Sequence, residues 1–465
     1  YGIYTVVAGV VTMFSFLSNA MATASQRYFS FDLGKGDTEH LKTTFSVTFQ
    51  IYVLLALLVV LLAETLGLWF VNHKLVIPPE RMLAANWIFQ AAIFSFLLTL
   101  ITTPYMASII AHEDMKVYAY VSIVEAGLKL GIVFLLRIIP TDKLIMYGLL
   151  LAGVSFINTS CYRLYCHRHY EECNFRLIKD GILFKDIVGY SGWNLFGSLS
   201  LVLKKQVTNI ILNIYFGVVV NAARGIASQV NTAVASLAQN FTTAIKPQIV
   251  KKYASNQKEE SIQTVFKSCK FTFFLMYLFS FPLIVEMNSV LSIWLNVPPA
   301  DAVIFSRLAL VEALIDSVSY SIMTLSQATG KIKLYQSVVG GVLLLNLPIS
   351  WIVLHFGAPA YSVMIVTIII CCINFFVRII IVHFTAGFSI LQFIMKTVMP
   401  CLLVGLLASV LPIFFHVFFV KNTILSIANI FVSVITTCLI VVFLGMNKSE
   451  RKFLLEIIKK KGMAK

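Results

Sequence analysis

Charged residues are scarce in this chain. Only 12% of its 465 residues are Asp, Glu, Lys or Arg, whereas a soluble globular chain carries about 25%. The deficit extends over the whole length, 59% of the residues are hydrophobic, and the mean hydropathy is +0.87. This composition excludes a second, soluble domain of any size and predicts a polytopic membrane protein.

Signatures of catalysis and metal binding are also missing. The sequence has no Ser-His-Asp set and no deaminase motif, and the GKG at 34–36 lacks the spacing of a phosphate-binding Walker loop. Eight cysteines are scattered without a CxxC pair, so we expect free thiols. The CHRHYEEC run from Cys166 to Cys173 has ligand-type side chains but not the separated ligand pairs of a zinc site. We therefore predict a protein that is not an enzyme and holds no metal or cofactor.

Long hydrophobic runs dominate what is present. Runs of about 20 residues can cross the ~30 Å hydrocarbon core as helices. The chain contains thirteen, at 3–25, 44–70, 84–105, 117–136, 144–165, 187–216, 219–245, 265–286, 302–325, 335–354, 360–382, 394–418 and 423–445. We treat 187–216 as one span, because splitting it at its lysine pair leaves pieces of about 15 residues. The chain starts inside an apolar run without Met, so we expect an upstream segment and a fourteenth span.

The distribution of Lys and Arg predicts the orientation. Placing the basic tail at 446–465 in the cytoplasm puts roughly 26 of the 36 Lys and Arg on that side and about five on the outer side. A single missed span would destroy this bias. The rule therefore supports the span count, and it places Tyr1 on the outer side.

An internal repeat is visible in the connections. Glu64 precedes Pro78-Pro79 as Glu286 precedes Pro298-Pro299, and the proline pairs are 220 residues apart. The segments 111–118 and 328–335, and the residues Asn19 and Asn240, match at similar offsets. The separation is six spans, so the two halves are parallel repeats, and such pairs hold their substrate at the interface between them. We predict an N-terminal bundle, a cytoplasmic amphipathic linker, a C-terminal bundle, two extra helices and a basic tail, at 1–165, 166–186, 187–393, 394–445 and 446–465.

Basic side chains fall inside several of the predicted spans. Lys204 and Lys205 lie about 18 residues into their span, near or beyond the midplane, where an unpaired lysine costs at least ~2.5 kcal/mol. Lys129 lies near the middle of its span, one turn after Glu125. We predict a cationic lumen for an anionic cargo, formed by Lys129, Lys204, Lys205, Arg224, Arg27 and Arg307. The alternatives are snorkelling to the surface, or a self-contained pair of Lys129 with Glu125.

Polar and acidic side chains complete the predicted pathway. The run 219–245 is a helix of Ala, Ser, Thr, Asn and Gln, which a membrane tolerates when it faces water or another helix. We expect the lumen to be lined by Asn194, Asn209, Asn231, Gln229 and Asn240. Glu312 and Asp316 share one helix face, and with Glu125 they are candidates for coupling to Na⁺ or H⁺. The alternative is that each acid pairs with a neighbouring cation.

The sequence resembles a known group of transporters. The opening YGIYTVVAGVVTMFSFLSNAMATASQRYFSFDLGKGD, with IPPERMLAANW, ASIIAHEDM and YCHRHYEEC, is similar to lipid-linked oligosaccharide flippases of gut Bacteroidales. These belong to the multidrug/oligosaccharidyl-lipid/polysaccharide exporter superfamily. The resemblance covers nearly all 465 residues. It implies an all-α fold of two six-helix bundles plus two helices, alternating access, and a cationic lumen for a diphosphate. Lys129, Lys204 and Lys205 are the cations that it carries over.

Three functions follow as hypotheses. The leading one is a flippase that moves a polyprenyl-pyrophosphate oligosaccharide across the bacterial inner membrane, in polysaccharide, lipopolysaccharide or O-antigen synthesis. The second is a cation-coupled multidrug antiporter of the same fold, which requires a net acidic lumen. The third is a membrane-bound glycosyltransferase, polymerase or ligase. Outer connections of under about 20 residues leave little room for its catalytic domain.

Overall fold

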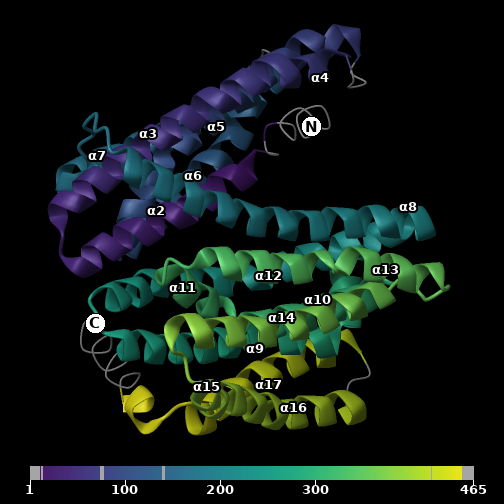
Figure 1. The fold of residues 1–465 in the computed structure, drawn as a ribbon. Helices are drawn as coiled ribbons and strands as arrows, with labels where there is room; N and C mark the ends of the chain where they lie inside the picture. The colour runs from purple at the N-terminus through teal and green to yellow at the C-terminus, as the bar shows by residue number, and fades with distance from the viewer. Residues whose placement is uncertain (1–10, 12–13, 74–77, 139–141, 420–421, 453–465) are drawn as a thin grey trace, which may run out of the picture. The chain divides into compact units, whose positions relative to one another are not determined.

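The computed structural model describes residues 11, 14–73, 78–138, 142–419 and 422–452 (Figure 1). Over these residues the structure is built from helices and has no strand, which confirms the predicted all-α class. The α-helices are α2 (Ser15–Lys35), α3 (Thr38–Leu62), α4 (Leu68–His73), α5 (Met82–Ala111), α6 (Met115–Ile138), α7 (Lys143–His169), α8 (Gly181–Ala254), α9 (Lys258–Leu295), α10 (Ala302–Ser317), α11 (Tyr320–Ala328), α12 (Ile332–Leu344), α13 (Asn346–His355), α14 (Ser362–Ala386), α15 (Ile390–Phe393), α16 (Met399–Phe419) and α17 (Thr423–Ile440).

Ten helices of the described chain are long and apolar enough to cross a membrane. They match ten of the thirteen predicted spans. The runs 3–25, 219–245 and 302–325 correspond to α2, to the second half of α8 and to α10 with α11. These helices fall outside the ten. Residues 3–10, 12 and 13 of the first run lie outside the described residues, the second half of α8 is rich in amides and hydroxyls, and the third run is broken into two helices.

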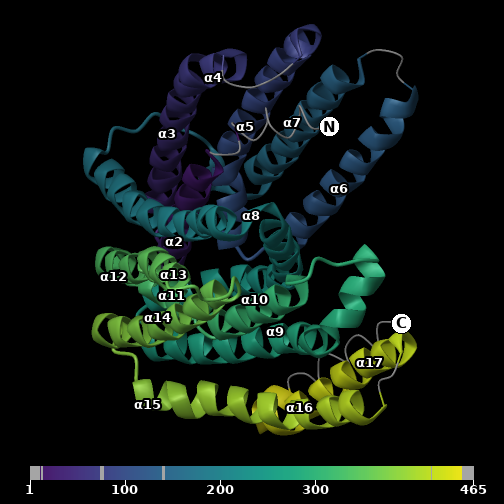
Figure 2. The same cartoon turned by 90° about the vertical axis from the view of Figure 1, so that its right-hand side faces the viewer.

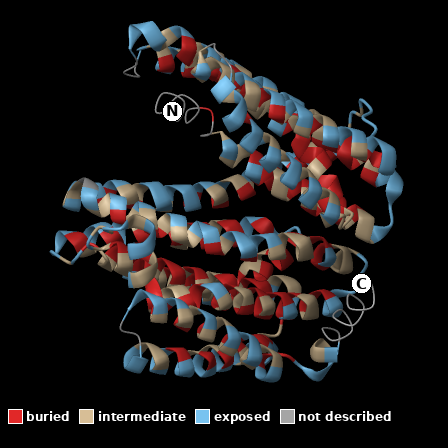
Figure 3. Cartoon of the chain, turned by 180° about the vertical axis from the view of Figure 1, so that it is seen from behind, coloured by how far each residue is buried: buried red, intermediate tan, exposed pale blue. Residues whose placement is uncertain are grey.

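Two compact units make up the chain. The first comprises Tyr1–Leu199 with Val250–Lys258, and the second comprises Ser200–Ile249 with Glu259–Lys465. In the first unit α5 packs against α2, α3 and α7 (Figure 2). In the second unit α14 packs against α10, α12 and α13, and α16 packs against α17. Figure 3 shows buried residues on the facing sides of these helices and exposed residues on their outward sides.

Local sequence signals start and end the helices. Asp37 caps α3 by accepting a hydrogen bond from the His40 N–H at 2.9 Å, and Asn422 caps α17 through the Leu425 N–H at 3.0 Å. Gly217 has a φ of 76° and divides α8 into two helices. The predicted boundary between spans 187–216 and 219–245 falls at this glycine, and 187–216 is one helix as expected.

Two spans of the second unit are interrupted. α10 ends at Ser317 and α11 begins at Tyr320. α12 ends at Leu344 and α13 begins at Asn346, two residues before Pro348. Proline has no N–H to donate to the carbonyl four residues earlier, so the second interruption follows from the sequence. Interrupted helices expose main-chain groups at membrane depth, where they must be satisfied inside the protein.

The linker differs from its predicted form. In place of an amphipathic helix over 166–186, the structure has the last turn of α7, a short 3-10 turn (η3, Glu171–Cys173) and an extended segment before α8. All eight cysteines are free thiols, as expected, and Cys166 and Cys173 are buried. The linker therefore packs into the first unit instead of forming an independent helix.

Three consecutive residues after α5 organise this end of the first unit. His112 Nε2 lies 2.6 Å from Glu172 Oε1, Glu113 bonds to Lys251 at 2.8 Å, and Asp114 accepts a hydrogen bond from Tyr165. Glu172 is buried, which disfavours its charged form. Its hydrogen bonds with His112, its own backbone N–H and Ser108 outweigh burial and hold the pKa of Glu172 below its usual value.

This network predicts an acid-sensitive contribution to stability. The pKa of Glu172 is lowered in the folded state, so its carboxylate stabilises the fold above about pH 4.3 and the contribution is lost as pH falls. Glu172→Gln should lower stability by roughly 1–3 kcal/mol near neutral pH. The difference from wild type should shrink in thermal unfolding series towards about pH 3.5. The exposed neighbour provides a matched control, Glu171→Gln, and an equal effect of both substitutions would contradict this account.

Candidate functional site

A polar pocket lies in the second unit, between the second half of α8 and the interrupted pair α10 and α11. Its volume is about 210 Å³. The lining residues are Asn231, Thr232, Ala235, Ser236 and Gln239 of α8, with Glu312, Ala313, Asp316 and Tyr320. Amide, hydroxyl and carboxylate groups therefore converge at one place in this part of the membrane region.

Helical periodicity places the α8 residues in this pocket. Asn231, Ala235 and Gln239 recur every four residues, with two hydroxyl residues beside them, so they share one helix face. The other face consists of small apolar residues, including Ala223, Ala227 and Val234, which are buried in the main hydrophobic core of this unit. The predicted polar helix is thus amphipathic, with its apolar side in the core and its polar side on the pocket.

The carboxylate of Glu312 is neutralised by Lys204. Lys204 Nζ lies 2.7 Å from Glu312 Oε1, and the two side chains are only 13% and 16% exposed. Lys204 comes from the first half of α8 and Glu312 from the middle of α10. One of the two mid-span lysines is therefore not a free cation. Its charge compensates an acid of the pocket wall.

The carboxylate of Asp316 is held by an arginine at the break between α10 and α11. Arg378 Nη1 lies 3.0 Å from Asp316 Oδ1, and the same nitrogen donates to Ser319 Oγ. Asp316 lies in the last turn of α10, and Ser319 immediately precedes α11. Arg378 therefore bridges the helix interruption and neutralises the second acid of the pocket at the same time.

Two cations of the second unit have no such partner. Among the described residues, no carboxylate lies within ion-pair distance of Lys205 or Arg224. The Lys205 side chain is exposed, whereas Arg224 is half-buried and donates to Asn209 Oδ1 and to the Lys205 carbonyl. Two acids and four bases occupy this region, so its formal charge is positive.

The first unit holds a second, smaller polar group around Lys129. Lys129 Nζ lies 2.6 Å from Glu125 Oε1, and Asn158 donates to the other carboxylate oxygen at 3.1 Å. The Lys129 side chain is 53% exposed and reaches a cavity of about 240 Å³ lined by Val11, Ile88, Ala92, Ser95, Phe96, Thr99, Lys129, Gly148, Leu151 and Ser155. Lys129 and Glu125 thus form a pair in which Glu125 is also bound to α7.

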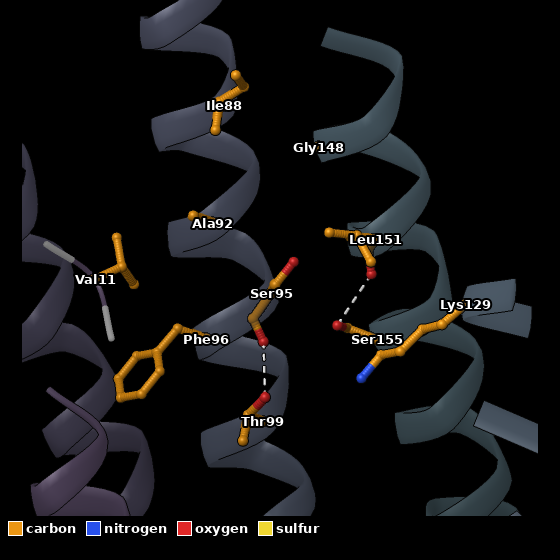
Figure 4. Close-up of a pocket in the computed structure, with 10 residues that line it drawn as sticks. All are labelled: Val11, Ile88, Ala92, Ser95, Phe96, Thr99, Lys129, Gly148, Leu151 and Ser155. Atoms are coloured by element: carbon orange, nitrogen blue, oxygen red, sulfur yellow. Dashed lines mark hydrogen bonds between the residues drawn. The ribbon is translucent and has the colours of Figure 1, made fainter. Parts of the chain in front are cut away.

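Figure 4 shows the Lys129 amino group turned towards this cavity, beside Ser155. The Ser155 hydroxyl donates to the Leu151 carbonyl at 3.1 Å, and the Thr99 hydroxyl donates to the Ser95 carbonyl at 3.0 Å. Because these hydroxyl groups donate their hydrogens to backbone carbonyls, only their oxygen lone pairs are left for the cavity. The walls therefore accept hydrogen bonds, and the ammonium group is the strong donor.

Arg27 lies near the end of α2 in an aromatic setting. Its guanidinium carbon is 4.7 Å from the ring centre of Tyr28, 4.8 Å from that of Phe31 and 5.4 Å from that of Tyr190. The residue is only 9% exposed. Three aromatic faces stabilise this buried cation, which accounts for its position without an anionic cargo.

The remaining predicted residues are dispersed. Arg307 donates to the Ile284 carbonyl at 2.8 Å and to the Val285 carbonyl at 3.3 Å, so it binds the backbone of α9 instead of snorkelling. Asn194 is buried in the first unit. Gln229 and Asn240 are exposed and do not line the pocket, whereas Asn231 does.

Sequence reasoning missed several residues that the structure brings to the pocket. Gln239, Thr232 and Ser236 follow Asn231 at helical spacing, so a face analysis of 219–245 could have found them. Arg378 lies inside the predicted span 360–382, and its charge alone could have marked it. Tyr320 carries no signal in the sequence, because the helix break beside it was not predicted.

The fold defines a class of polytopic helical membrane proteins with solved members. No protein-family model and no curated protein matches the chain. Among similar solved structures is an outward-facing multidrug resistance MATE family transporter of the MOP superfamily, with a TM-score of 0.72 and 11% identity over 83% of this chain and 87% of that one. A MOP superfamily transporter from Pyrococcus furiosus is similar with a TM-score of 0.71 and 10% identity, over 82% and 88%. A MATE crystal structure in the bent conformation gives 0.70 and 12%, over 82% and 86%.

The two adjacent lysines provide a test of the pocket geometry. Breaking a buried pair by removing one partner costs about 3–5 kcal/mol, because the other charge stays buried. We expect this cost for Lys204→Met and for Glu312→Gln, and a smaller cost for the double substitution. Thermal unfolding of the purified protein measures each. The control Lys205→Met should stay within about 0.5 kcal/mol of wild type, and equal effects at both lysines would contradict the assignment.

Proposed function

We propose that the chain is a flippase that moves a polyprenyl-pyrophosphate-linked oligosaccharide across the bacterial inner membrane by alternating access, with its C-terminus in the cytoplasm. The observation that carries this proposal is the polar pocket of the second unit. Its two acids are each neutralised by a base, whereas Lys205 and Arg224, which do not line the pocket itself but belong to the same unit, have no carboxylate partner among the described residues. Unpaired cations at membrane depth are costly and mark pathways for charged cargo.

The fold supports transport in general. The similar solved structures are transporters, and the prediction of a protein that is not an enzyme agrees with them. One of them was described as having a binding pocket of reversed polarity that suggests a different function. For the present chain, we take the charge of the pocket as the feature that separates the candidate cargoes.

The pocket residues and the two cations outside its lining suit the two parts of such a cargo. Lys205 and Arg224 supply the donors that a diphosphate requires. The amides of Asn231 and Gln239 both donate and accept, as sugar hydroxyls require. The polyprenyl chain stays in the bilayer, and switching is a rocking of one bundle against the other. Release of Glu312 or Asp316 from its base is the step at which a proton or Na⁺ couples.

A cation-coupled antiporter is the second candidate. The observation that favours it is that the Glu312 and Asp316 carboxylates line the pocket directly. A cationic drug that displaced Lys204 or Arg378 from them would find two acidic partners. The net positive charge of the region opposes this reading, because such a site should attract cations.

The flippase and the antiporter predict different results in reconstituted vesicles: transfer of a lipid-linked sugar in the first case, and efflux of a cationic dye in the second. Lys205→Ala/Arg224→Ala should lower the transfer of a fluorescent polyprenyl-diphosphate disaccharide between leaflets by about tenfold or more, since each charge-assisted bond contributes roughly 1.5–3 kcal/mol. The charge-preserving control Lys205→Arg/Arg224→Lys should retain most activity. The physiological measure is surface-glycan complementation with the same variants.

Full activity of the double alanine variant would overturn the assignment of these cations. Efflux of a cationic dye that is abolished by Glu312→Gln or Asp316→Asn, together with no lipid transfer by wild type, would establish the antiporter instead. Turnover of the lipid-linked sugar by the purified protein would establish an enzyme.

A further inference from the structure

A buried carboxylate lies outside the pocket, where α9 departs from helical geometry. Glu286 has φ −99° and ψ 21° and is only 2% exposed. Its Oε1 lies 2.7 Å from His416 Nδ1 of α16 and 2.6 Å from Asn429 Nδ2 of α17. Three helices of the second unit therefore meet at one acidic side chain.

Few charged or titratable side chains of the described residues lie on α16 and α17, the two helices that meet α9 at Glu286. His416 is the one titratable side chain of α16 apart from Cys401, and α17 carries no charged residue. On α10, Arg307 donates to the Ile284 and Val285 carbonyls at the same bend, whereas the carboxylate bonds to His416 and Asn429. Among the described residues, the cluster therefore consists of Glu286 and His416 with Asn429 as a neutral donor, and Arg307 binds the backbone at the same bend.

One side of the cluster is exposed. The His416 side chain is 39% exposed, although its partner is buried. It lies near the end of α16, and Asn429 lies near the start of α17, so the cluster is at the end of these helices that the charge distribution predicts to face outward. The ring can exchange a proton with that aqueous phase and pass it to the carboxylate.

Buried polar atoms continue from the cluster along α17. Ser426, Asn429, Ser433 and Thr437 recur at helical spacing and are all buried. Within the described chain, Asn429 Oδ1, Ser433 Oγ and Thr437 Oγ1 have no hydrogen-bond partner. Unsatisfied buried oxygens are costly and indicate groups that receive a proton donor such as water. The stripe ends at Ile440, which packs against the apolar cluster of Phe274, Cys401 and Val404.

We propose that Glu286, His416 and Asn429 form a proton-binding site at the junction of α9, α16 and α17, and that the polar stripe of α17 extends it into the membrane. A carboxylate beside a neutral imidazole leaves one negative charge buried, whereas one added proton gives a carboxylate–imidazolium pair without net charge. The site is separate from the Glu312 and Asp316 pocket, and the inference is independent of the cargo.

Stability as a function of pH tests the site. Histidine changes its charge between about pH 5 and 8. A site that binds a proton in the folded protein but not in the unfolded chain stabilises the fold more at low pH than at high pH. The melting temperature of purified wild type should therefore fall by roughly 2–4 °C between about pH 5.5 and pH 8, relative to Glu286→Gln/His416→Gln. That double variant removes both titrating groups while keeping side chains that hydrogen-bond.

A matched control comes from α14. His383 contacts the Phe388 carbonyl and not a carboxylate, so His383→Gln should keep the wild-type pH dependence. The same series is run in sodium chloride and in choline chloride. The proposal is overturned if wild type and the double variant show the same pH dependence, or if Na⁺ alone accounts for the difference between them. If the double variant does not fold, the single variants His416→Gln and Glu286→Gln provide the same comparison.

Discussion

Charge inside a membrane protein must be neutralised by the protein itself, and the structure is arranged around this requirement. Lys204 with Glu312, and Arg378 with Asp316, pair across helices that are far apart in the sequence. Each pair joins elements of the second unit that apolar packing alone would leave free to slide, because lipid supplies no hydrophobic drive between helices. The ion pairs therefore fix the register of α8, α10 and α14 around the polar pocket.

The same requirement explains the irregular backbone. Arg378 bridges the break between α10 and α11, and Arg307 binds carbonyls at the bend of α9. Glu64 and Glu286, which the repeat in the sequence matched, both lie where a helix departs from α geometry. Glu64 lies in the π-helical stretch η1 (Ala63–Gly67), and Glu286 lies at the bend. Polar side chains thus gather where the backbone departs from regular helix, as expected for irregular structure at membrane depth.

Much of the fold could be predicted because hydrophobic length has a direct physical cause. The all-α class, ten of the spans and the division of α8 near Gly217 follow from the thickness of the bilayer. The site was harder to predict, because a sequence shows how deep a residue lies in the membrane but not which way its side chain points. Lys204 and Lys205 are adjacent and equally deep, yet one is paired and the other exposed, since neighbouring helical positions point about 100° apart. Arg378 as a partner of Asp316 depends on long-range packing that no local pattern encodes.

The basic side chains consequently divide into two sets with different meanings. Those paired with an acid, such as Lys204 and Arg378, hold helices in place, and their positive charge is not available to a ligand. Lys205 and Arg224 are not paired with an acid, and a bound anion would offset the free-energy cost of placing these charges at membrane depth. A count of cations at membrane depth therefore overstates how positive a lumen is. An anionic cargo would be bound by the second set alone, because the described residues provide no acid to neutralise Lys205 and Arg224.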